Sequence, residues 1–289
     1  MVAGKALAWV TFALLILAEV GASEKKCYKK EGPEGLTIKF KVTKDDCPTQ
    51  FLFIVNILDP MVQTHDCTGV LIDPRTVLVP ASCVTKTAKV LRDQFPLVRV
   101  GSYNLNKPDG LENQETIPVC KKIIHSGFNG NPANGSDIAL LELKTPISTQ
   151  EPIEISATQA ADCVGQRLTA VGWFSPRLNG PPSAEVEVLP RLTIVQRNRC
   201  RSLLDGLPEG AVCALSDPAA NVVWDHGSPL LCDDNVLVGL ASYTKNTAGH
   251  YPCIYTHVVD YRDWIDSRGE GASRVEYNPQ EDCTGRTEL

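Results

Sequence analysis

Short apolar runs separated by turn-forming residues dominate the chain from residue 51 onward. Each run is rich in Val, Ile and Leu, and clusters of Gly, Pro, Asn and Asp lie between the runs. Strands of this length and spacing are typical of an all-β barrel or sandwich, and no alternation of strands with helices is visible. We therefore predict an all-β fold with strands at Phe51–Leu58, Gly69–Ile72, Leu97–Tyr103, Ile138–Leu143, Leu168–Trp173, Val186–Val195, Val236–Tyr243 and Ile254–Val259.

The end of this region carries the one clear helix signal. Asp260 is a candidate N-cap, because its side chain can accept hydrogen bonds from the first free amides of a helix. The residues that follow, Tyr261–Ser267, place Trp264 and Ile265 on one apolar side. We expect a short helix here that closes the β-rich region.

Two polar segments flank this region. Residues 24–50 are rich in Lys and contain Cys27 and Cys47, whereas residues 267–289 are polar with several Gly and Glu. We interpret them as an N-terminal cysteine-containing extension and a polar C-terminal tail around a β-rich domain at 51–266. Acidic residues are mixed with the lysines of the first segment, so a solvated arm is favoured there over a polyanion site.

The first 23 residues predict secretion. Lys5 gives a short positive start, residues 6–18 are an almost unbroken apolar run, and small residues follow at 21–23. This is the pattern of a secretory signal peptide. A membrane anchor is disfavoured, because a spanning helix needs ~20 apolar residues and this run is shorter. We expect an extracellular mature protein with no membrane partner.

The overall charge argues against two classes of partner. Among 289 residues, 28 are Lys or Arg and 34 are Asp or Glu, which gives a formal net charge of −6 and no basic block. Nucleic acids and anionic membrane surfaces require a concentrated positive charge, so neither is an expected partner.

Several ordered motifs resemble the trypsin-like serine protease family. The matching segments are CTGVLI at 67–72, VLVPASC at 77–83, SDIALLEL at 136–143, VGW at 171–173, and IYT with YRDWI between 254 and 265. The resemblance covers residues 51–266. It implies two perpendicular six-stranded β-barrels, a cleft between them and a C-terminal α-helix.

The resemblance also implies acyl-transfer chemistry, but the residues that perform it are changed. That chemistry needs a hydroxyl nucleophile, an imidazole base, a carboxylate that orients the imidazole, and backbone amides aimed at the oxyanion. Only the carboxylate is retained, as Asp137. Ser82 stands at the base position, His226 at the nucleophile position and Trp224 at a glycine of the oxyanion hole. We therefore expect no enzyme activity.

Two interpretations of the exchanged pair remain open. In the first, Ser82 is a nucleophile and His226 its base, which would make the protein a weak hydrolase. In the second, His226 fills space and hydrogen-bonds to Ser82, Asp137 or water, while Asp137 is a buried acceptor. We favour the second, because the oxyanion donors belong to the His226 turn and would not face a carbonyl attacked from Ser82.

Two further departures from the family point the same way. In the family, cleavage before I-V-G-G creates an ammonium that pairs with the aspartate before the nucleophile. Asp225 is present here, but residues 38–42 contain no such start, so Asp225 must find another donor or accept a raised pKa. At the substrate pocket, Ala220 aligns with its base, and Thr244 and Cys253 replace wall glycines. We expect a narrowed pocket with no acid to bind Arg or Lys.

Within the family, one run indicates a subgroup. The sequence DHGSPLLC at 225–232 is most similar to D-G-G-S-P-L-V-C of the arthropod serine protease homologues related to masquerade and prophenoloxidase-activating cofactors, which are inactive. A clip domain needs six cysteines, and only Cys27 and Cys47 precede the barrels. We therefore expect an arthropod-type inactive homologue without a clip domain.

The chain has 11 cysteines, so in an oxidising compartment at least one stays free or pairs with another molecule. Family spacing implies the bridges Cys67–Cys83, Cys200–Cys213 and Cys163–Cys232. The cysteines that it leaves unassigned are Cys27, Cys47, Cys120, Cys253 and Cys283. Cys283, in the polar tail, is our candidate for a free thiol or an intermolecular disulfide.

Two other site types can be judged from the sequence. Asn134 begins the chain's single N-glycosylation sequon, in a polar loop, so we expect it to carry a glycan. The remaining histidines, which show no ligand spacing with carboxylates or cysteines, are His65, His125, His250 and His257. We therefore predict no metal site and no cofactor.

Taken together, these features favour a secreted protein that acts by binding. It would serve as a cofactor, adaptor or decoy for a protease, a zymogen or another extracellular protein, because loops on a rigid barrel pair can be reused once catalysis is lost. The alternatives are the weak hydrolase described above and a structural or small-ligand carrier component of a body fluid.

Overall fold

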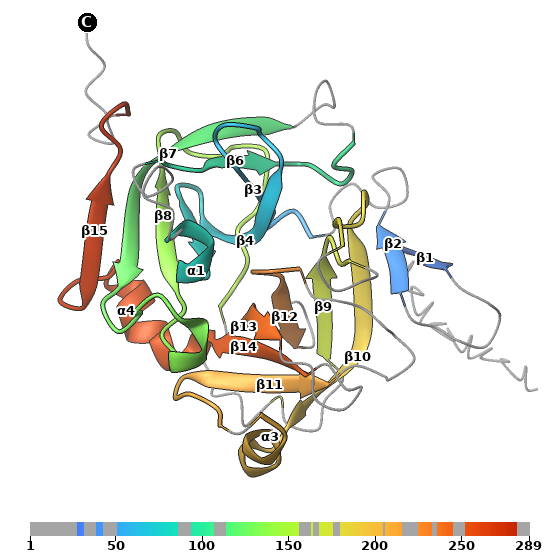
Figure 1. Cartoon of the computed structure of the whole chain (residues 1–289). Helices are drawn as coiled ribbons and strands as arrows, with labels where there is room; N and C mark the ends of the chain where they lie inside the picture. The colour runs from blue at the N-terminus through green and yellow to red at the C-terminus, as the bar shows by residue number, and fades with distance from the viewer. Residues whose placement is uncertain are drawn as a thin grey trace, which may run out of the picture.

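The computed structural model describes residues 28–31, 39–42, 51–85, 94–106, 114–155, 163, 168–175, 180–204, 206–215, 225–232, 236–244 and 252–281. Their strands form two sheets, and each sheet closes into a barrel of six antiparallel strands. In Figure 1 one barrel lies above the other, and the short helix α1 (Ala81–Val84) lies in the region between them. The predicted all-β class with two six-stranded barrels is confirmed.

The first barrel closes through its longest strand. Its members are β3 (Ile54–Leu58), β4 (His65–Asp73), β5 (Thr76–Val79), β6 (Leu97–Val100), β7 (Glu115–His125) and β8 (Ala139–Leu143). The N-terminal part of β7 pairs with β6 and its C-terminal part pairs with β8, which joins the two ends of the sheet. Every residue of β3 and β5 is buried, which explains why these strands show apolar runs rather than alternation.

The second barrel closes through β9 (Leu168–Gly172), which pairs with both neighbours at the ends of the sheet. The other strands are β10 (Glu187–Val195), β11 (Ala211–Leu215), β12 (Pro229–Cys232), β13 (Val236–Thr244) and β14 (Cys253–His257). A disulfide links Cys163 to Cys232 on β12, and a second links Cys200 to Cys213 on β11. These are pairs that the family spacing implied.

Both extensions add strands to the barrels. From the N-terminal extension, β1 (Tyr28–Glu31) pairs with β2 (Lys39–Val42), and β2 pairs with β10 of the second barrel. From the C-terminal tail, β15 (Ser273–Tyr277) pairs with β7 of the first barrel. Figure 1 shows β15 at the left edge of the molecule and β1 and β2 at the right edge.

The helices are short. Besides α1, those in the described part of the chain are η1 (Pro132–Asn134), α3 (Arg197–Leu204), η5 (Val258–Tyr261) and α4 (Arg262–Asp266). The predicted C-terminal helix is present as α4, but Asp260 is not its N-cap: it lies inside the 3-10 turn η5, and Tyr261 occupies the cap position. The Asp260 carboxylate instead lies 2.9 Å from Nδ1 of His257. Within the described residues, none of the helices combines the length and apolar content that a membrane crossing requires.

Candidate functional site

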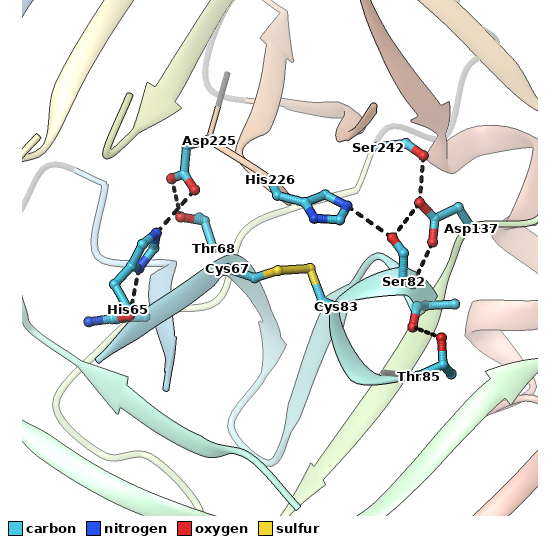
Figure 2. Close-up of a disulfide and its surroundings, with 12 residues drawn as sticks. His65, Cys67, Thr68, Ser82, Cys83, Thr85, Asp137, Asp225, His226 and Ser242 are labelled. Atoms are coloured by element: carbon cyan, nitrogen blue, oxygen red, sulfur yellow. Dashed lines mark hydrogen bonds and ion pairs between the residues drawn. A yellow bond between two sulfur atoms is a disulfide. The ribbon is translucent and has the colours of Figure 1, made fainter. Parts of the chain in front are cut away.

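Ser82, Asp137 and His226 come together in the structure although 144 residues separate the first from the last. Ser82 lies on α1, which the Cys67–Cys83 disulfide ties to β4. Asp137 lies between η1 and β8, and His226 lies in the turn before β12. Figure 2 shows the three side chains in one row across the two barrels. The exchanged family positions therefore form a single polar site.

Asp137 is the acceptor at one end of this row. It is 1% exposed. Its Oδ1 accepts a hydrogen bond of 2.7 Å from the Ser82 amide, and its Oδ2 accepts from the hydroxyls of Ser82 at 2.8 Å and Ser242 at 2.5 Å. The Thr256 hydroxyl also donates to the Asp137 carbonyl at 2.8 Å. These donors satisfy a carboxylate that burial would otherwise penalise.

His226 lies at the opposite end, with its Nε2 2.9 Å from Ser82 Oγ. The Ser82 hydroxyl has one proton, and it donates that proton to the Asp137 carboxylate. The hydroxyl oxygen must then accept from a protonated Nε2 of His226. The order of groups is thus carboxylate, hydroxyl, imidazole. In this arrangement the carboxylate contacts the hydroxyl and not the imidazole, and the serine proton points away from the imidazole.

The turn that carries His226 is fixed by the backbone around Gly227. Gly227 has φ +84° and donates its N–H to Ala241 O at 2.7 Å, and a Cβ at this position would collide with the Thr68 carbonyl. The Thr68 amide in turn donates to His226 O at 2.8 Å. Strand β4 therefore holds the turn in one position and aims His226 at Ser82.

Asp225, next to His226, is buried and has donors from the protein interior. The Thr68 hydroxyl and the Trp173 amide, the latter at 2.8 Å, donate to its Oδ2. His65 Nε2 lies 3.2 Å from Oδ1, and His65 Nδ1 lies 2.8 Å from Asn56 Oδ1. The His65 ring also packs against Trp173, with centroids 5.1 Å apart. These groups occupy the carboxylate that the family pairs with an N-terminal ammonium.

The sequence reasoning missed the partners of Asp225 and of Asp137. One signal was available: Thr68 stands where the family motif has a glycine, and its hydroxyl is a donor to Asp225. His65 lies two residues before Cys67, and its sequence context gives no sign of its contact with Asp225. Ser242 and Thr256 lie on neighbouring strands of the second barrel, so their approach to Asp137 depends on the pairing of β13 with β14.

Two of the four predicted pocket or oxyanion residues, Ala220 and Trp224, lie outside the described residues. Of the other two, Thr244 is half-buried and lies opposite the fully buried Cys253 in the pairing of β13 with β14. Burial raises the pKa of the Cys253 thiol well above its ordinary value, and it does the same for the neighbouring Tyr255 hydroxyl. Cys253 is therefore a neutral, enclosed thiol.

The remaining cysteines can be sorted further. Cys253 is the free cysteine of the described residues. Cys120 is disulfide-bonded, and the other described cysteines pair among themselves. Its partner is therefore one of the three cysteines outside the described residues, which are Cys27, Cys47 and Cys283.

The described residues bring one set of metal-ligand types together, at Cys67, Cys83 and His226. The two sulfurs are joined in a disulfide, so they are not thiolates that could bind a metal ion. Asn134, the glycosylation candidate, is exposed at the end of η1, three residues before Asp137.

Comparison with known proteins gives one consistent family. The model of the family described as Trypsin matches residues 43–265. Kallikrein-8 of Rattus norvegicus is 32% identical over 212 residues, which are 69% of this chain and 75% of that protein. Trypsin eta of Drosophila erecta is 31% identical over 212 residues, with 70% and 77% covered.

A solved structure extends this similarity to the fold. Neuropsin, a serine protease expressed in the limbic system of mouse brain, superposes with a TM-score of 0.63 at 27% identity. The superposition covers 76% of this chain and 95% of that one. The similarity therefore includes both barrels.

Proposed function

Since the chain belongs to the trypsin family of serine proteases, we propose that it is a secreted member without peptidase activity, which acts by binding another extracellular protein as a cofactor, adaptor or decoy. The observation that carries this proposal is the order Asp137, Ser82, His226 in the hydrogen-bonded row. A protease of this kind needs the imidazole between the carboxylate and the hydroxyl.

The reversed order removes the proton transfer on which catalysis depends. A general base must accept the nucleophile's proton as the new bond forms. Here the Ser82 proton is directed to a carboxylate that also accepts from the Ser82 amide and the Ser242 hydroxyl. The Ser82 proton therefore points to this carboxylate and away from the His226 imidazole, so no imidazole base is placed to take it as the new bond forms.

The surroundings of Asp225 support the same conclusion. In the active members that the sequence resembles, this aspartate pairs with a new N-terminal ammonium after cleavage. Here its two oxygens already face Thr68, Trp173 and His65. Activation by that route would have to displace three buried partners, which makes a switch to an active state unfavourable.

Secretion and binding rest on different observations. Three disulfides among the described residues fit an oxidising compartment. The rigid barrel pair and the exposed loop at Asn134 beside the site fit a scaffold whose loops contact a partner. An Asn134 glycan would cover the Asp137 side of the site.

A weak hydrolase is the second candidate, because the Ser82–His226 distance of 2.9 Å suits a nucleophile and its base. A fluorophosphonate probe distinguishes the two candidates in the purified mature protein. We expect no labelling under conditions that label trypsin completely. Labelling of the wild type that disappears in Ser82→Ala would establish the hydrolase and refute the inactive protein.

Binding needs a separate test. The mature protein is immobilised and exposed to its native fluid at native salt, and captured proteins are tested for co-elution with it in size-exclusion chromatography. We expect a stoichiometric protein partner that the reduced and unfolded protein does not capture. Recovery of no protein partner would contradict the adaptor proposal even if the probe result stands.

A further inference from the structure

Among the described residues, strand β15 is paired along one edge only. It pairs with β7, and within the part of the chain that the structure describes no other strand pairs with it. Figure 1 shows it at the outer limit of the molecule, beyond β7. An open edge presents N–H and C=O groups that can pair with another chain, and proteins usually protect such edges with charged side chains, Pro or a bulge. Strand β15, SRVEY, has no Pro and no bulge in its pairing with β7, and its two charged residues, Arg274 and Glu276, are of opposite sign.

The hydrogen bonds that flank β15 show which residues face the open edge. Asn278 donates its N–H to Cys120 O at 2.8 Å, and Ser126 donates to Ala272 O at 3.0 Å. The register of β15 with β7, continued by one residue at each end, places Asn278 opposite Cys120 and Ala272 opposite Ser126. These two pairs are therefore hydrogen-bonded pairs, which recur at every second residue of an antiparallel ladder. The backbone groups that face β7 therefore belong to Arg274 and Glu276, and those that face the open edge belong to Ser273, Val275 and Tyr277.

Strand β15 carries two large apolar side chains that are exposed. Val275 is 42% exposed and Tyr277 is 68% exposed, and they are two of the four large hydrophobic residues that are exposed in the described part of the chain. On the other face, Arg274 Nε lies 3.2 Å from Glu276 Oε1. The Arg274 side chain is 53% exposed, so it can reach a second carboxylate.

We propose that β15 is a self-association edge, through which two copies of this chain pair antiparallel about a two-fold axis at Val275. In this register Val275 lies opposite Val275 of the second copy, and Ser273 lies opposite Tyr277. All three are hydrogen-bonded pairs, because their N–H and C=O groups face the open edge. Arg274 lies opposite Glu276 twice, once in each direction.

Self-complementarity favours a second copy over an unrelated extended segment. An Arg and a Glu placed symmetrically about a central Val match their own two-fold image in charge, and opposite-charge pairs across strands are stabilising. An unrelated partner strand would have to carry an acidic residue opposite Arg274 and a basic residue opposite Glu276. Five residues form a small contact, so we expect a weak dimer with a dissociation constant in the range of tens of micromolar.

Sedimentation velocity of the mature protein between about 1 and 200 µM tests the proposal. We expect a reversible monomer–dimer equilibrium. Amide hydrogen exchange locates it: the N–H groups of Val275 and Tyr277 should become protected as concentration rises, whereas those of Arg274 and Glu276 stay protected throughout. A monomer at every concentration, or a dimer in which Val275 and Tyr277 exchange as in the monomer, would overturn the proposal.

Two substitutions sharpen the test. Arg274→Glu places carboxylates opposite each other twice and should weaken the dimer at least ~10-fold. Val275→Pro removes an N–H that faces only the open edge, so it should abolish the dimer while leaving the pairing with β7. The matched control Val275→Thr keeps the N–H and a β-branched side chain, and it should dimerise. Thermal unfolding shows that each variant is folded, and an undiminished dimer in Arg274→Glu and Val275→Pro would refute the proposed register.

Discussion

A hydroxyl at position 82 lies between a carboxylate and an imidazole, and this order decides what the site can do. The residue types of a serine protease triad are all present in Asp137, Ser82 and His226, and two of them have exchanged places. Because a hydroxyl has one proton, the acceptor that takes it sets the donor and acceptor roles of the other hydrogen bonds in the row. At the scale of single residues, the direction of proton donation in the site therefore depends on the spatial order of the three side chains, and not only on which residue types are present.

Asp137 should be important for stability even without catalysis. In Asp137→Asn an amide group would face donors at positions where the carboxylate accepts from Ser82 and Ser242. We expect a loss of about 2–4 kcal/mol in the free energy of unfolding. Urea denaturation measures it, with the exposed Asp263→Asn as a control that should change stability by less than about 0.5 kcal/mol. Equal effects in both variants would contradict a structural role.

The enclosed thiol of Cys253 gives a second prediction at this scale. It is fully buried, and its raised pKa keeps it protonated, so a thiol reagent should not react with the native protein. After unfolding in denaturant without reductant, alkylation and peptide mass spectrometry should find the label on Cys253. Label on Cys283 of the native protein would instead identify the tail cysteine as the free thiol, as the sequence first suggested.

At the scale of elements, β7 and β15 form one unit that the sequence pattern concealed. Strand β7 contains Pro118 and the pair Lys121 and Lys122, which are unfavourable signals for a barrel strand. Lys122 is nevertheless 1% exposed in its side chain, because its Nζ lies 2.8 Å from Glu276 of β15 and 4.4 Å from the Phe95 ring centroid. The counter-charge comes from about 150 residues away, where no local pattern could show it.

This ion pair predicts that the tail strand stabilises the barrel. Glu276→Gln removes the nearest negative charge from a buried ammonium, and we expect a loss of about 2–3 kcal/mol in the free energy of unfolding. Lys122→Met removes the buried charge itself, so Glu276→Gln should cost less than about 1 kcal/mol when it is added to that variant. Thermal and urea unfolding of the four proteins completes the cycle, and additive losses would show that the pair does not interact.

His125 links the C-terminal helix to the first barrel and should make stability depend on pH. Its ring lies 5.2 Å from those of Tyr261 and Trp264, and Nδ1 accepts a hydrogen bond from the Gly127 amide at 3.1 Å. Desolvation lowers its pKa below the ordinary value of 6.5. The unfolded chain therefore binds the proton first, and the stabilising contribution, complete above pH 6.5, is lost as the pH falls towards the folded pKa.

The measurement compares the wild type with His125→Phe, which retains an aromatic ring and cannot titrate. Unfolding free energies at pH 7.5 and about pH 5 should show a smaller loss in the variant than in the wild type. If the unfolding free energies of the two proteins fell equally with pH, His125 would not be the cause of the pH dependence.

At the scale of the whole molecule, the sequence predicted the frame of the site better than its contacts. The barrels and the positions of Ser82, Asp137 and His226 followed from ordered motifs, because strand order fixes which segments meet. The direction of the hydrogen bonds and the role of His65 did not follow, because they depend on side chains of separate strands that only the closed barrels bring together. The same holds for β15, whose partner strand lies about 150 residues earlier in the chain.

Restoring the family residues tests whether the proposed loss of peptidase activity depends on the whole molecule or on three positions alone. The variant Ser82→His, Trp224→Gly, His226→Ser would recover the order carboxylate, imidazole, hydroxyl. Asp225 would still be held by Thr68, Trp173 and His65. Asp225 directly precedes the nucleophile position, so its contacts fix the turn that would have to place the nucleophile and the oxyanion donors. We therefore expect fluorophosphonate labelling at least ~100-fold slower than that of trypsin.

A second variant adds Thr68→Gly and His65→Phe, which remove two of the contacts of Asp225, and this variant should be labelled faster than the first. Labelling at the rate of trypsin in the first variant would show that the three positions alone had disabled the site, and that the contacts of Asp225 do not matter.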